Sequence, residues 1–405
     1  MSQLDHFVTP YLELVGQRLA KAITQTQGDY SYSSGLAGKL MAHVCLNQDR
    51  EDFDLQQIEE GIVACLAALP KYGLGLFQGS TGIMFAALEI DRYFNLGIAQ
   101  DAAFDYDDYL RDSFKYQQNL PYHFDLISGI AGLTVYGCYR AQTTGDNQLL
   151  QLCVDQLEKM STQKNGLCHW FTPPEWIRGF PMGIANPMGC IDLGMAHGQP
   201  GVYAALAYAL ASGQDQRDKC RQMLSAGLKE LAHYELADGH GHFGTAANSD
   251  KHSRCAWCYG DLGPISALRL AAYALKQAEP DHWAERIMQT MANRPMPELG
   301  FHDAWMCHGS VGSAWILEQL QCPAPQLITA IHQLHDDDGP FSVNYSARHD
   351  PGIELGILEG LSGAALALAE MQGKTLPLHW SLPFMAGLKT LNFNFAQVSQ
   401  LASAW

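Results

Sequence analysis

One stretch decides how this chain folds, and it reads Gly198-Gln199-Pro200-Gly201-Val202-Tyr203-Ala204-Ala205-Leu206-Ala207-Tyr208-Ala209-Leu210. Two glycines three positions apart open a run that is apolar on every side, which is typical of a helix buried on all faces. Because glycine lacks a Cβ, the backbone can turn sharply before such a helix, and neighbouring elements can approach it closely. One copy of this pattern alone would carry little information.

The pattern occurs seven times in the 405 residues, and each Gly-x-x-Gly pair precedes an Ala/Leu-rich run. Successive pairs are 44 to 69 residues apart, which leaves room for two helices and their connections. The pairs are Gly35/Gly38, Gly79/Gly82, Gly129/Gly132, Gly198/Gly201, Gly260/Gly263, Gly309/Gly312 and Gly360/Gly363. Amphipathic segments such as 55–69 and 215–236 lie between the apolar runs. Seven buried helices alternating with seven amphipathic ones predict an inner ring inside an outer ring. This is an all-α fold, an α/α toroid, which we expect to form a single domain over residues 1–405.

Composition limits the classes of partner. The chain has 25 basic and 42 acidic side chains, a formal charge of -17, and it has no basic cluster, so we expect no nucleic-acid partner. It contains no apolar run of about 18 residues and no secretory signal at its start, which predicts a cytoplasmic protein without an integral membrane segment. The 11 cysteines are an odd number thinly spread, and this favours reduced thiols over a disulfide framework.

Two stretches depart from the repeat. Residues 165–190 are rich in turn residues and aromatics, so we expect an ordered loop rather than a helix there, placed to roof the ring. Residues 335–352 are expected to form a second, solvated loop.

Three potential metal ligands share one register of the repeat. Cys258 and Cys307 each stand two residues before the first glycine of a pair, and His308 stands one residue before it. Two thiolates and an imidazole suit zinc, and they leave a fourth tetrahedral position for water or substrate. Gly309 allows the turn by which Cys307 and His308, although adjacent, can face one ion. The alternative is that the two cysteines are small core residues, which we expect for Cys65, Cys138, Cys153, Cys220 and Cys255.

Further polar residues stand at similar offsets. His197 lies one residue before its glycine, Asp125 four before and Arg254 six before, so all are expected at one end of the ring with the cysteines. Other interpretations remain for each of them. His197 can be a packed histidine, Asp125 a helix cap, and Arg254 the partner of a nearby acidic residue such as Asp250.

Five further residues have open or minor assignments. Asp192 can be a helix cap, and Asp303 can be either a cap or an orienting partner of His308. Three repeats have no candidate ligand or catalytic residue. In these repeats the residue before the first glycine is Ser34, Gln78 or Glu359, and we expect each to lie at the rim of the ring.

These motifs together resemble the lanthionine synthetase C-like proteins, the lanthipeptide cyclases. The resemblance rests on the sevenfold Gly-x-x-Gly, on 254–260 with its Trp-Cys-Tyr-Gly, on 193–198 with its Ala-His-Gly and on 307–309, and it runs from about Gly35 to Gly363. It implies a double ring of seven inner and seven outer helices. It also implies one zinc held by Cys258, Cys307 and His308, with Asp125, His197 and Arg254 at catalytic positions. Two segments depart from the pattern, 260–264 and 186–192, and they bear on substrate specificity.

The reaction that this resemblance implies is the addition of a peptide cysteine thiol to dehydroalanine or dehydrobutyrine, closing a thioether ring. Zinc would deprotonate the thiol, Arg254 would hold the enolate oxygen, His197 would protonate Cα, and Asp125 would orient His197. The partners would be a dehydrated precursor peptide and a dehydratase, in a cytoplasmic complex at the periphery of the membrane.

Three other functions fit parts of the same pattern. A glutathione-handling member of the superfamily would use the same metal and thiol chemistry. An α/α-toroid glycosidase would need two converging carboxylates, where this sequence offers thiols. A noncatalytic helical-repeat scaffold would need no metal.

Overall fold

The computed structural model describes residues 2–25, 28–212, 217–236, 241–292, 294–301, 303–322, 327 and 354–387. The regular secondary structure of the described residues is helical apart from one two-stranded hairpin. It forms two compact units, each built from separate stretches of sequence. Unit 1 comprises Met1–Tyr109, Arg254–Cys258 and Pro295–Trp380, and unit 2 comprises Leu110–Ser253, Tyr259–Arg294 and Ser381–Trp405.

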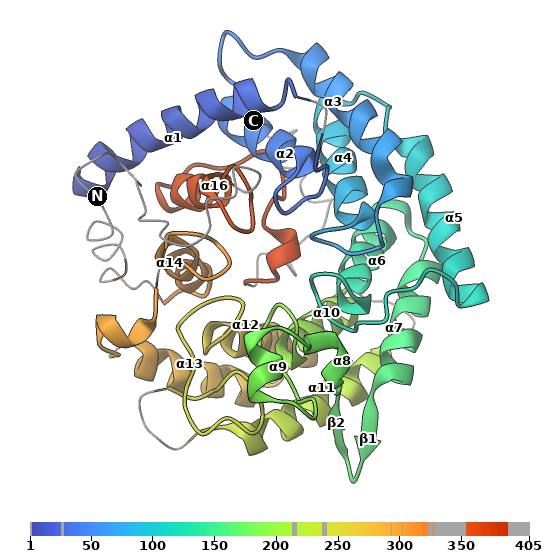
Figure 1. Cartoon of the computed structure of the whole chain (residues 1–405), viewed down its shortest axis with the longest axis vertical. Coiled ribbons are helices and arrows are strands. Elements are labelled where there is room, and N and C mark those ends of the chain that lie inside the picture. Colours follow the sequence, from blue (N-terminus) through green and yellow to red (C-terminus); the bar gives the residue numbers. More distant parts are fainter. Residues whose placement is uncertain are drawn as a thin grey trace. The chain divides into compact units, whose positions relative to one another are not determined.

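Four of the seven glycine-led helices belong to unit 1, and they are buried along most of their length. They are α2 (Leu36–Asn47), α4 (Ser80–Phe94), α14 (Ser310–Gln319) and α16 (Leu361–Met371). Helix α16, from the last repeat, packs against α2 from the first repeat and against α14 (Figure 1). The helices α1 (Ser2–Ala22) and α3 (Leu55–Ala68) cover this inner set, because α1 contacts α2 and α16 while α3 contacts α2 and α4.

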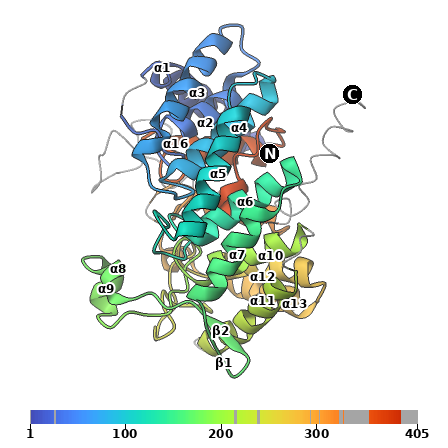
Figure 2. The same ribbon diagram turned by 90° about the vertical axis from the view of Figure 1, so that its right-hand side faces the viewer.

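Unit 2 holds the other three glycine-led helices, α6 (Ile130–Thr144), α10 (Gln199–Ala211) and α12 (Leu262–Leu275). Each has an amphipathic partner, which is α7 (Gln148–Met160) for α6, α11 (Arg217–Leu231) for α10 and α13 (Glu279–Ala292) for α12 (Figure 2). Helix α5 (Gln100–Tyr116) runs from unit 1 into unit 2. The seven predicted inner helices are therefore all present. The seventh amphipathic segment, between α14 and α16, lies outside the described residues.

The structure shows why the second glycine of the pair is needed. In five pairs, a Cβ at that glycine would lie between 1.8 and 2.5 Å from the carbonyl oxygen of the residue six positions earlier. At Gly82 this oxygen belongs to Leu76, and the Cβ would also come within 2.8 Å of Tyr32 in the preceding repeat. Glycine thus permits both the tight turn into the helix and the close approach of the neighbouring repeat, as predicted.

The stretch 165–190 corrects one expectation. A hairpin pairs β1 (Thr162–Lys164) with β2 (Leu167–His169), and two short helices follow, α8 (Pro174–Ile177) and α9 (Pro181–Ala185). The prediction of a loop without helices was wrong because both prolines stand at the first helical position, where a missing N–H and a preset φ favour a helix start. The predicted loop at 335–352 lies outside the described residues.

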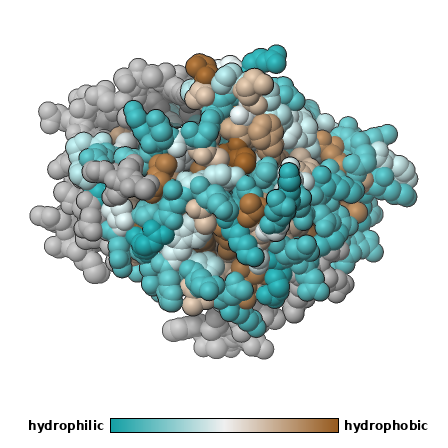
Figure 3. All heavy atoms as spheres, turned by 90° about the horizontal axis from the view of Figure 1, so that it is seen from below, coloured by the Kyte–Doolittle hydropathy of each residue, from teal (hydrophilic) through white to brown (hydrophobic). Residues whose placement is uncertain are grey.

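Figure 3 shows one face of the molecule, on which hydrophilic side chains predominate and hydrophobic ones reach the surface in places. None of the described helices is both long enough and apolar enough to cross a membrane.

Candidate metal centre and histidine–aspartate pair

A ladder of backbone hydrogen bonds places the two candidate cysteines side by side. In unit 1, these bonds join one position of the repeat, which is the residue two places before the first glycine. The amide of this residue in one repeat donates to the carbonyl of the corresponding residue in a neighbouring repeat. The amide of Cys258 donates to the carbonyl of Cys307 at 3.0 Å, Cys307 donates to Leu358 at 3.0 Å, Leu358 donates to Ser33 at 3.2 Å, and Ser33 donates to Phe77 at 2.9 Å. The shared offset predicted from the sequence is therefore a shared position in space.

The three candidate ligands converge in unit 1. One ligand atom each from Cys258, Cys307 and His308 lies within 4.8 Å of the other two. Both cysteines are buried, and the histidine is partly buried. A buried cluster of two thiols and one imidazole matches the donor chemistry that zinc requires, so these residues fit the ion predicted from the sequence.

Asp303 orients the imidazole. Its Oδ2 lies 2.8 Å from His308 Nε2, and its Oδ1 accepts the amide of Trp305 at 2.8 Å. Asp303 is thus the orienting partner of His308 and not a helix cap, because α14 begins after Gly309 with no side-chain cap. With Nε2 engaged by a carboxylate, Nδ1 is the ring nitrogen that would be left to bind a metal, as in many metal-binding histidines. Glu359, predicted as a rim residue, lies 3.9 Å from this Nδ1.

Arg254 contacts the cluster directly. Its Nη2 donates to Cys258 Sγ at 3.1 Å. A Cβ added at Gly300 would lie 2.9 Å from the Cβ of Arg254, so the glycine leaves room for this side chain.

The protonation of the cluster is shifted by its own contacts. The hydrogen bond from the Cys307 thiol, aided by His308 and Arg254, outweighs burial and lowers the pKa of the Cys258 thiol well below its usual value. Burial disfavours a charged ring at His308, but the hydrogen bond to Asp303 raises its pKa to about 9. The cluster therefore pairs an acidic thiol with a basic imidazole, and binding of a metal would displace protons from it.

His197 and Asp125 form a second polar pair, in unit 2. His197 Nδ1 lies 2.6 Å from Asp125 Oδ2, and the other carboxylate oxygen accepts the amide of Ser128 at 2.8 Å. Burial of Asp125 favours its neutral form, yet the hydrogen bond from His197 lowers its pKa. The carboxylate is buried while 48% of the histidine side chain is exposed, so a buried acid holds an imidazole that reaches the surface. That the pair meets the cysteine cluster at one end of a ring remains a prediction.

Two further residues bring a polar contact that the sequence analysis missed. The hydroxyl of Tyr259 donates to Asp192 Oδ2 at 2.9 Å, while Asp192 Oδ1 accepts the amide of Gly194 at 2.7 Å. Burial raises the pKa of Asp192 to about 6. Tyr259 stands one residue before Gly260, the offset that His197 and His308 occupy, so the repeat register contained the signal that identifies it.

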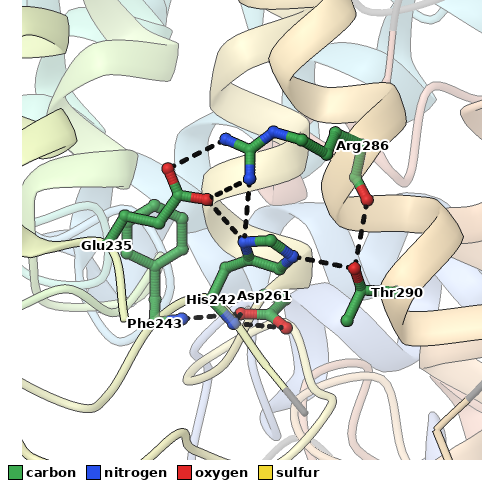
Figure 4. Close-up of polar contacts among 6 residues, drawn as sticks. All are labelled: Glu235, His242, Phe243, Asp261, Arg286 and Thr290. Carbon is green, nitrogen blue, oxygen red and sulfur yellow. Dashed lines mark hydrogen bonds and ion pairs between the residues drawn. The ribbon is translucent and has the colours of Figure 1, made fainter. Parts of the chain in front are cut away.

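A polar network in unit 2 holds the segment that leads along the chain toward Arg254 (Figure 4). The ring of His242 contacts Glu235 Oε1 at 2.5 Å and the Thr290 hydroxyl at 3.0 Å, and Arg286 bonds both oxygens of Glu235. Asp261, beside the start of α12, accepts the amides of His242 and Phe243. These contacts tie Glu235, His242 and Phe243 to α12 and α13, and we assign them a structural role.

The remaining sequence-predicted residues take ordinary positions. Ser34 donates its hydroxyl to Asp29 Oδ2 at 2.7 Å, and Gln78 is exposed. The five cysteines assigned to the core are all buried.

Comparison with known proteins agrees with this architecture. The family model described as lanthionine synthetase C-like protein matches residues 26–385, which is most of the chain. The chain belongs to the lanthionine synthetase C-like family. As a member, it is 26% identical over 382 residues to the nisin biosynthesis protein NisC of Lactococcus lactis subsp. lactis, covering 87% of this chain and 88% of that protein.

A solved structure named "Nisin cyclase" matches this lanthionine synthetase C-like chain with a TM-score of 0.73. The match covers 94% of this chain and 97% of that one at 20% identity, so it carries the fold and nothing more. That structure is an α/α toroid, and the fold predicted from the glycine repeat is thereby confirmed.

Proposed function

We propose that this protein is a zinc-dependent lanthipeptide cyclase, which adds cysteine thiols of a dehydrated peptide to dehydroalanine or dehydrobutyrine. The observation that carries the proposal is the convergence of Cys258, Cys307 and His308 within 4.8 Å, in a family whose relatives include a nisin biosynthesis protein. Cys258, Cys307 and His308 would hold the zinc, leaving one tetrahedral position for the substrate. When bound, the ion would lower the pKa of a substrate thiol so that it is deprotonated at neutral pH.

The addition conserves every atom of the peptide. A C–S bond forms at the β-carbon, the electron pair of the double bond moves onto Cα and the carbonyl oxygen, and Cα then takes a proton. The protein must therefore stabilise an enolate and supply a proton. It must also hold the two reacting residues of the peptide together.

His197 is suited to the proton transfer. Its Nδ1 is held by Asp125, so its Nε2 is the position on the exposed side of the ring. Histidine is the side chain most often used for general acid–base catalysis near neutral pH. We assign Asp125 to orienting His197 and to balancing its positive charge.

Arg254 has two tasks in this proposal. Its Nη2 supports the Cys258 sulfur, as the 3.1 Å contact indicates. A guanidinium has five N–H donors, so the remaining donors can hold the enolate oxygen. We further propose that a dehydratase supplies the substrate and that the two proteins work in the cytoplasm, in a complex at the periphery of the membrane.

The test uses a synthetic peptide with one cysteine and one dehydroalanine. Ring closure leaves the mass unchanged but removes the free thiol, so loss of labelling by N-ethylmaleimide measures it. We expect the wild type to remove the thiol and His197→Asn to be slower by roughly a hundredfold or more. A parallel reaction of glutathione with a dehydroalanine peptide that lacks cysteine tests the glutathione-handling alternative. Two outcomes would refute the cyclase assignment. One is a wild type that adds glutathione faster than it closes the ring, and the other is ring closure at the same rate by the wild type and by His197→Asn.

A further inference from the structure

Glu359 stands next to the candidate metal centre in the register of the repeat. It precedes Gly360, the first glycine of the seventh pair, so it occupies the offset that His308 occupies in the sixth pair. The amide of Cys307 donates at 3.0 Å to the carbonyl of Leu358, the residue before Glu359. The backbone ladder therefore places Glu359 beside the turn that carries Cys307 and His308.

The backbone on either side of Glu359 is fixed by hydrogen bonds. The amide of Ile357 donates to the Ser33 carbonyl at 2.7 Å, and the amide of Leu361 donates to the Glu354 carbonyl at 2.8 Å. We therefore expect the carboxylate of Glu359 to move by rotation of its side chain, while its backbone stays in place.

The carboxylate lies near the ring nitrogen of His308 that is left for a metal. Glu359 Oε1 is 3.9 Å from His308 Nδ1, while Asp303 holds the other nitrogen, Nε2, at 2.8 Å. Donor atoms that are about 2.0 to 2.3 Å from one tetrahedral zinc lie about 3.3 to 3.8 Å from each other. The distance between Oε1 and Nδ1 is therefore close to that between two ligands of one ion.

Glu359 stands at the edge of the centre and not within it. Among the described residues, Glu359 is not one of the donors that all lie within 4.8 Å of one another, which are Cys258, Cys307 and His308. Its side chain is 32% exposed, whereas that of Asp303 is 9% exposed and held by two polar contacts. Asp303 is therefore fixed, while the partly exposed Glu359 can change its rotamer.

We propose that Glu359 is a displaceable fourth ligand of the metal, which occupies the open position until a substrate thiolate replaces it. This inference rests on the proposed function, because it concerns the zinc that Cys258, Cys307 and His308 would hold. A tetrahedral ion with these three ligands has one position left, so the carboxylate and the substrate thiolate compete for it. Zinc binds soft sulfur ligands well, whereas carboxylates suit harder ions, and the thiolate is therefore favoured when it is present.

Two other roles for Glu359 make different predictions. If water held the fourth position alone, removing the carboxylate would leave the coordination of the metal unchanged. If the carboxylate acted through its charge alone, it would repel a substrate thiolate without binding the ion. Aspartate separates this second role from coordination, because it keeps the charge but withdraws the oxygens by one carbon–carbon bond, about 1.5 Å.

The test measures coordination without catalysis. The full chain is loaded with Co²⁺, whose visible absorption reports the number and kind of its ligands, and N-acetylcysteine amide is then added as a thiol with no dehydroamino acid to attack. We expect Glu359→Gln to change the Co²⁺ spectrum before the thiol is added. The variant should also bind the thiol about tenfold more tightly than the wild type, because a site that is blocked about nine-tenths of the time has a correspondingly weaker apparent affinity.

Two further variants complete the test. Glu359→Asp should behave like Glu359→Gln, because its oxygens no longer reach the metal. Glu354→Gln is the matched control, because it removes an exposed carboxylate of the same segment that pairs with Arg18 instead, and it should behave like the wild type.

The outcomes separate this inference from the cyclase assignment. A Glu359→Gln protein with the Co²⁺ spectrum and thiol affinity of the wild type would overturn the proposal and leave the proposed function intact. So would tighter thiol binding by Glu359→Gln alone, with Glu359→Asp like the wild type, because the carboxylate would then act through its charge. A wild type that takes up neither Zn²⁺ nor Co²⁺ would overturn both this inference and the zinc-dependent function.

Discussion

At the scale of single residues, the sulfur of Cys258 connects Arg254 to the candidate metal centre. It has Cys307 and His308 as fellow ligand residues, and it accepts a hydrogen bond from Arg254 at 3.1 Å. A guanidinium that donates a hydrogen bond to a metal-binding thiolate helps to orient it and changes its affinity for the metal. Arg254 therefore links the hold on the metal to the proposed chemistry of the substrate.

We predict that Arg254→Ala weakens zinc binding by roughly 10- to 100-fold and also slows ring closure. Arg254→Lys keeps the positive charge but has fewer donors and no planar fork, so we expect it to recover zinc affinity more than turnover. Zinc titration with a chromophoric chelator and the thiol-labelling assay measure the two quantities. If Arg254→Ala bound zinc as tightly as the wild type, the contact with Cys258 would have no role in holding the metal.

At the scale of single elements, the turn before each inner helix limits which residues the repeat tolerates. Gly82→Ala would place a Cβ 1.8 Å from the Leu76 carbonyl and 2.8 Å from Tyr32. Backbone must shift to relieve such contacts, so we expect a loss of roughly 2 kcal/mol or more in the free energy of unfolding. Gly73→Ala is the matched control in the same unit, because a Cβ there meets nothing within 4 Å. Denaturation by urea measures both, and equal stability of the two variants would contradict the explanation.

The contact between α1 and α2 includes a histidine that must stay neutral. The amide nitrogen of Asn47 lies 2.9 Å from His43 Nδ1 and donates to the Gly16 carbonyl at 2.8 Å, while the His43 ring stacks on Phe53. Burial, aided by Arg50, lowers the pKa of His43 to about 4. In the unfolded chain its pKa is about 6.5.

Acid should therefore weaken the protein through His43. As the pH falls below about 6.5 the unfolded chain binds a proton that the folded protein does not bind until about pH 4, so stability falls over this window. We expect His43 to account for about 1 kcal/mol of the difference in unfolding free energy between pH 7 and 5.5. His43→Leu should reduce this pH dependence, whereas substituting the exposed His233 in the same way should leave it intact. Parallel pH profiles for all three proteins would argue against a buried neutral His43.

At the scale of the whole molecule, segments from both ends of the chain pack together within unit 1. Helix α1 contacts α16, and the Tyr11 hydroxyl donates to the Leu361 carbonyl at 2.9 Å. The described core is built from the apolar faces of many helices, and the three candidate ligands come from only two adjacent repeats. The metal is therefore expected to support the reaction more than the fold.

We predict that chelation of zinc abolishes ring closure but leaves the helical circular dichroism unchanged at 25 °C. The melting temperature should fall by only a few degrees, because a bound ligand stabilises according to its affinity and its free concentration. Cys307→Ala should behave like the chelated wild type. Cooperative unfolding on chelation would show that the ion is a structural centre instead.

The sequence by itself determined the repeat, the seven inner helices and the three candidate ligands. These features follow from local chemistry, because the Gly-x-x-Gly pairs allow similar turns before the inner helices. In unit 1 the backbone hydrogen bonds link residues that stand two places before the first glycine of each pair. Cys258 and Cys307 both stand at this position, so counting residues was enough to predict that they are neighbours. The amphipathic pattern of 55–69 was likewise sufficient to locate α3.

Only the tertiary structure decided which partner each polar side chain chose. Counting offsets left the partner of Arg254 open, and it bonds Cys258. A helix cap was one possible role for Asp192, but its carboxylate accepts hydrogen bonds from Tyr259 and from the amide of Gly194. The two short helices α8 and α9 within the predicted ordered loop were missed, because each is too short to show a helical period. Side-chain partners depend on distances of a few tenths of an ångström between segments far apart in the chain, and no local pattern of residues encodes them.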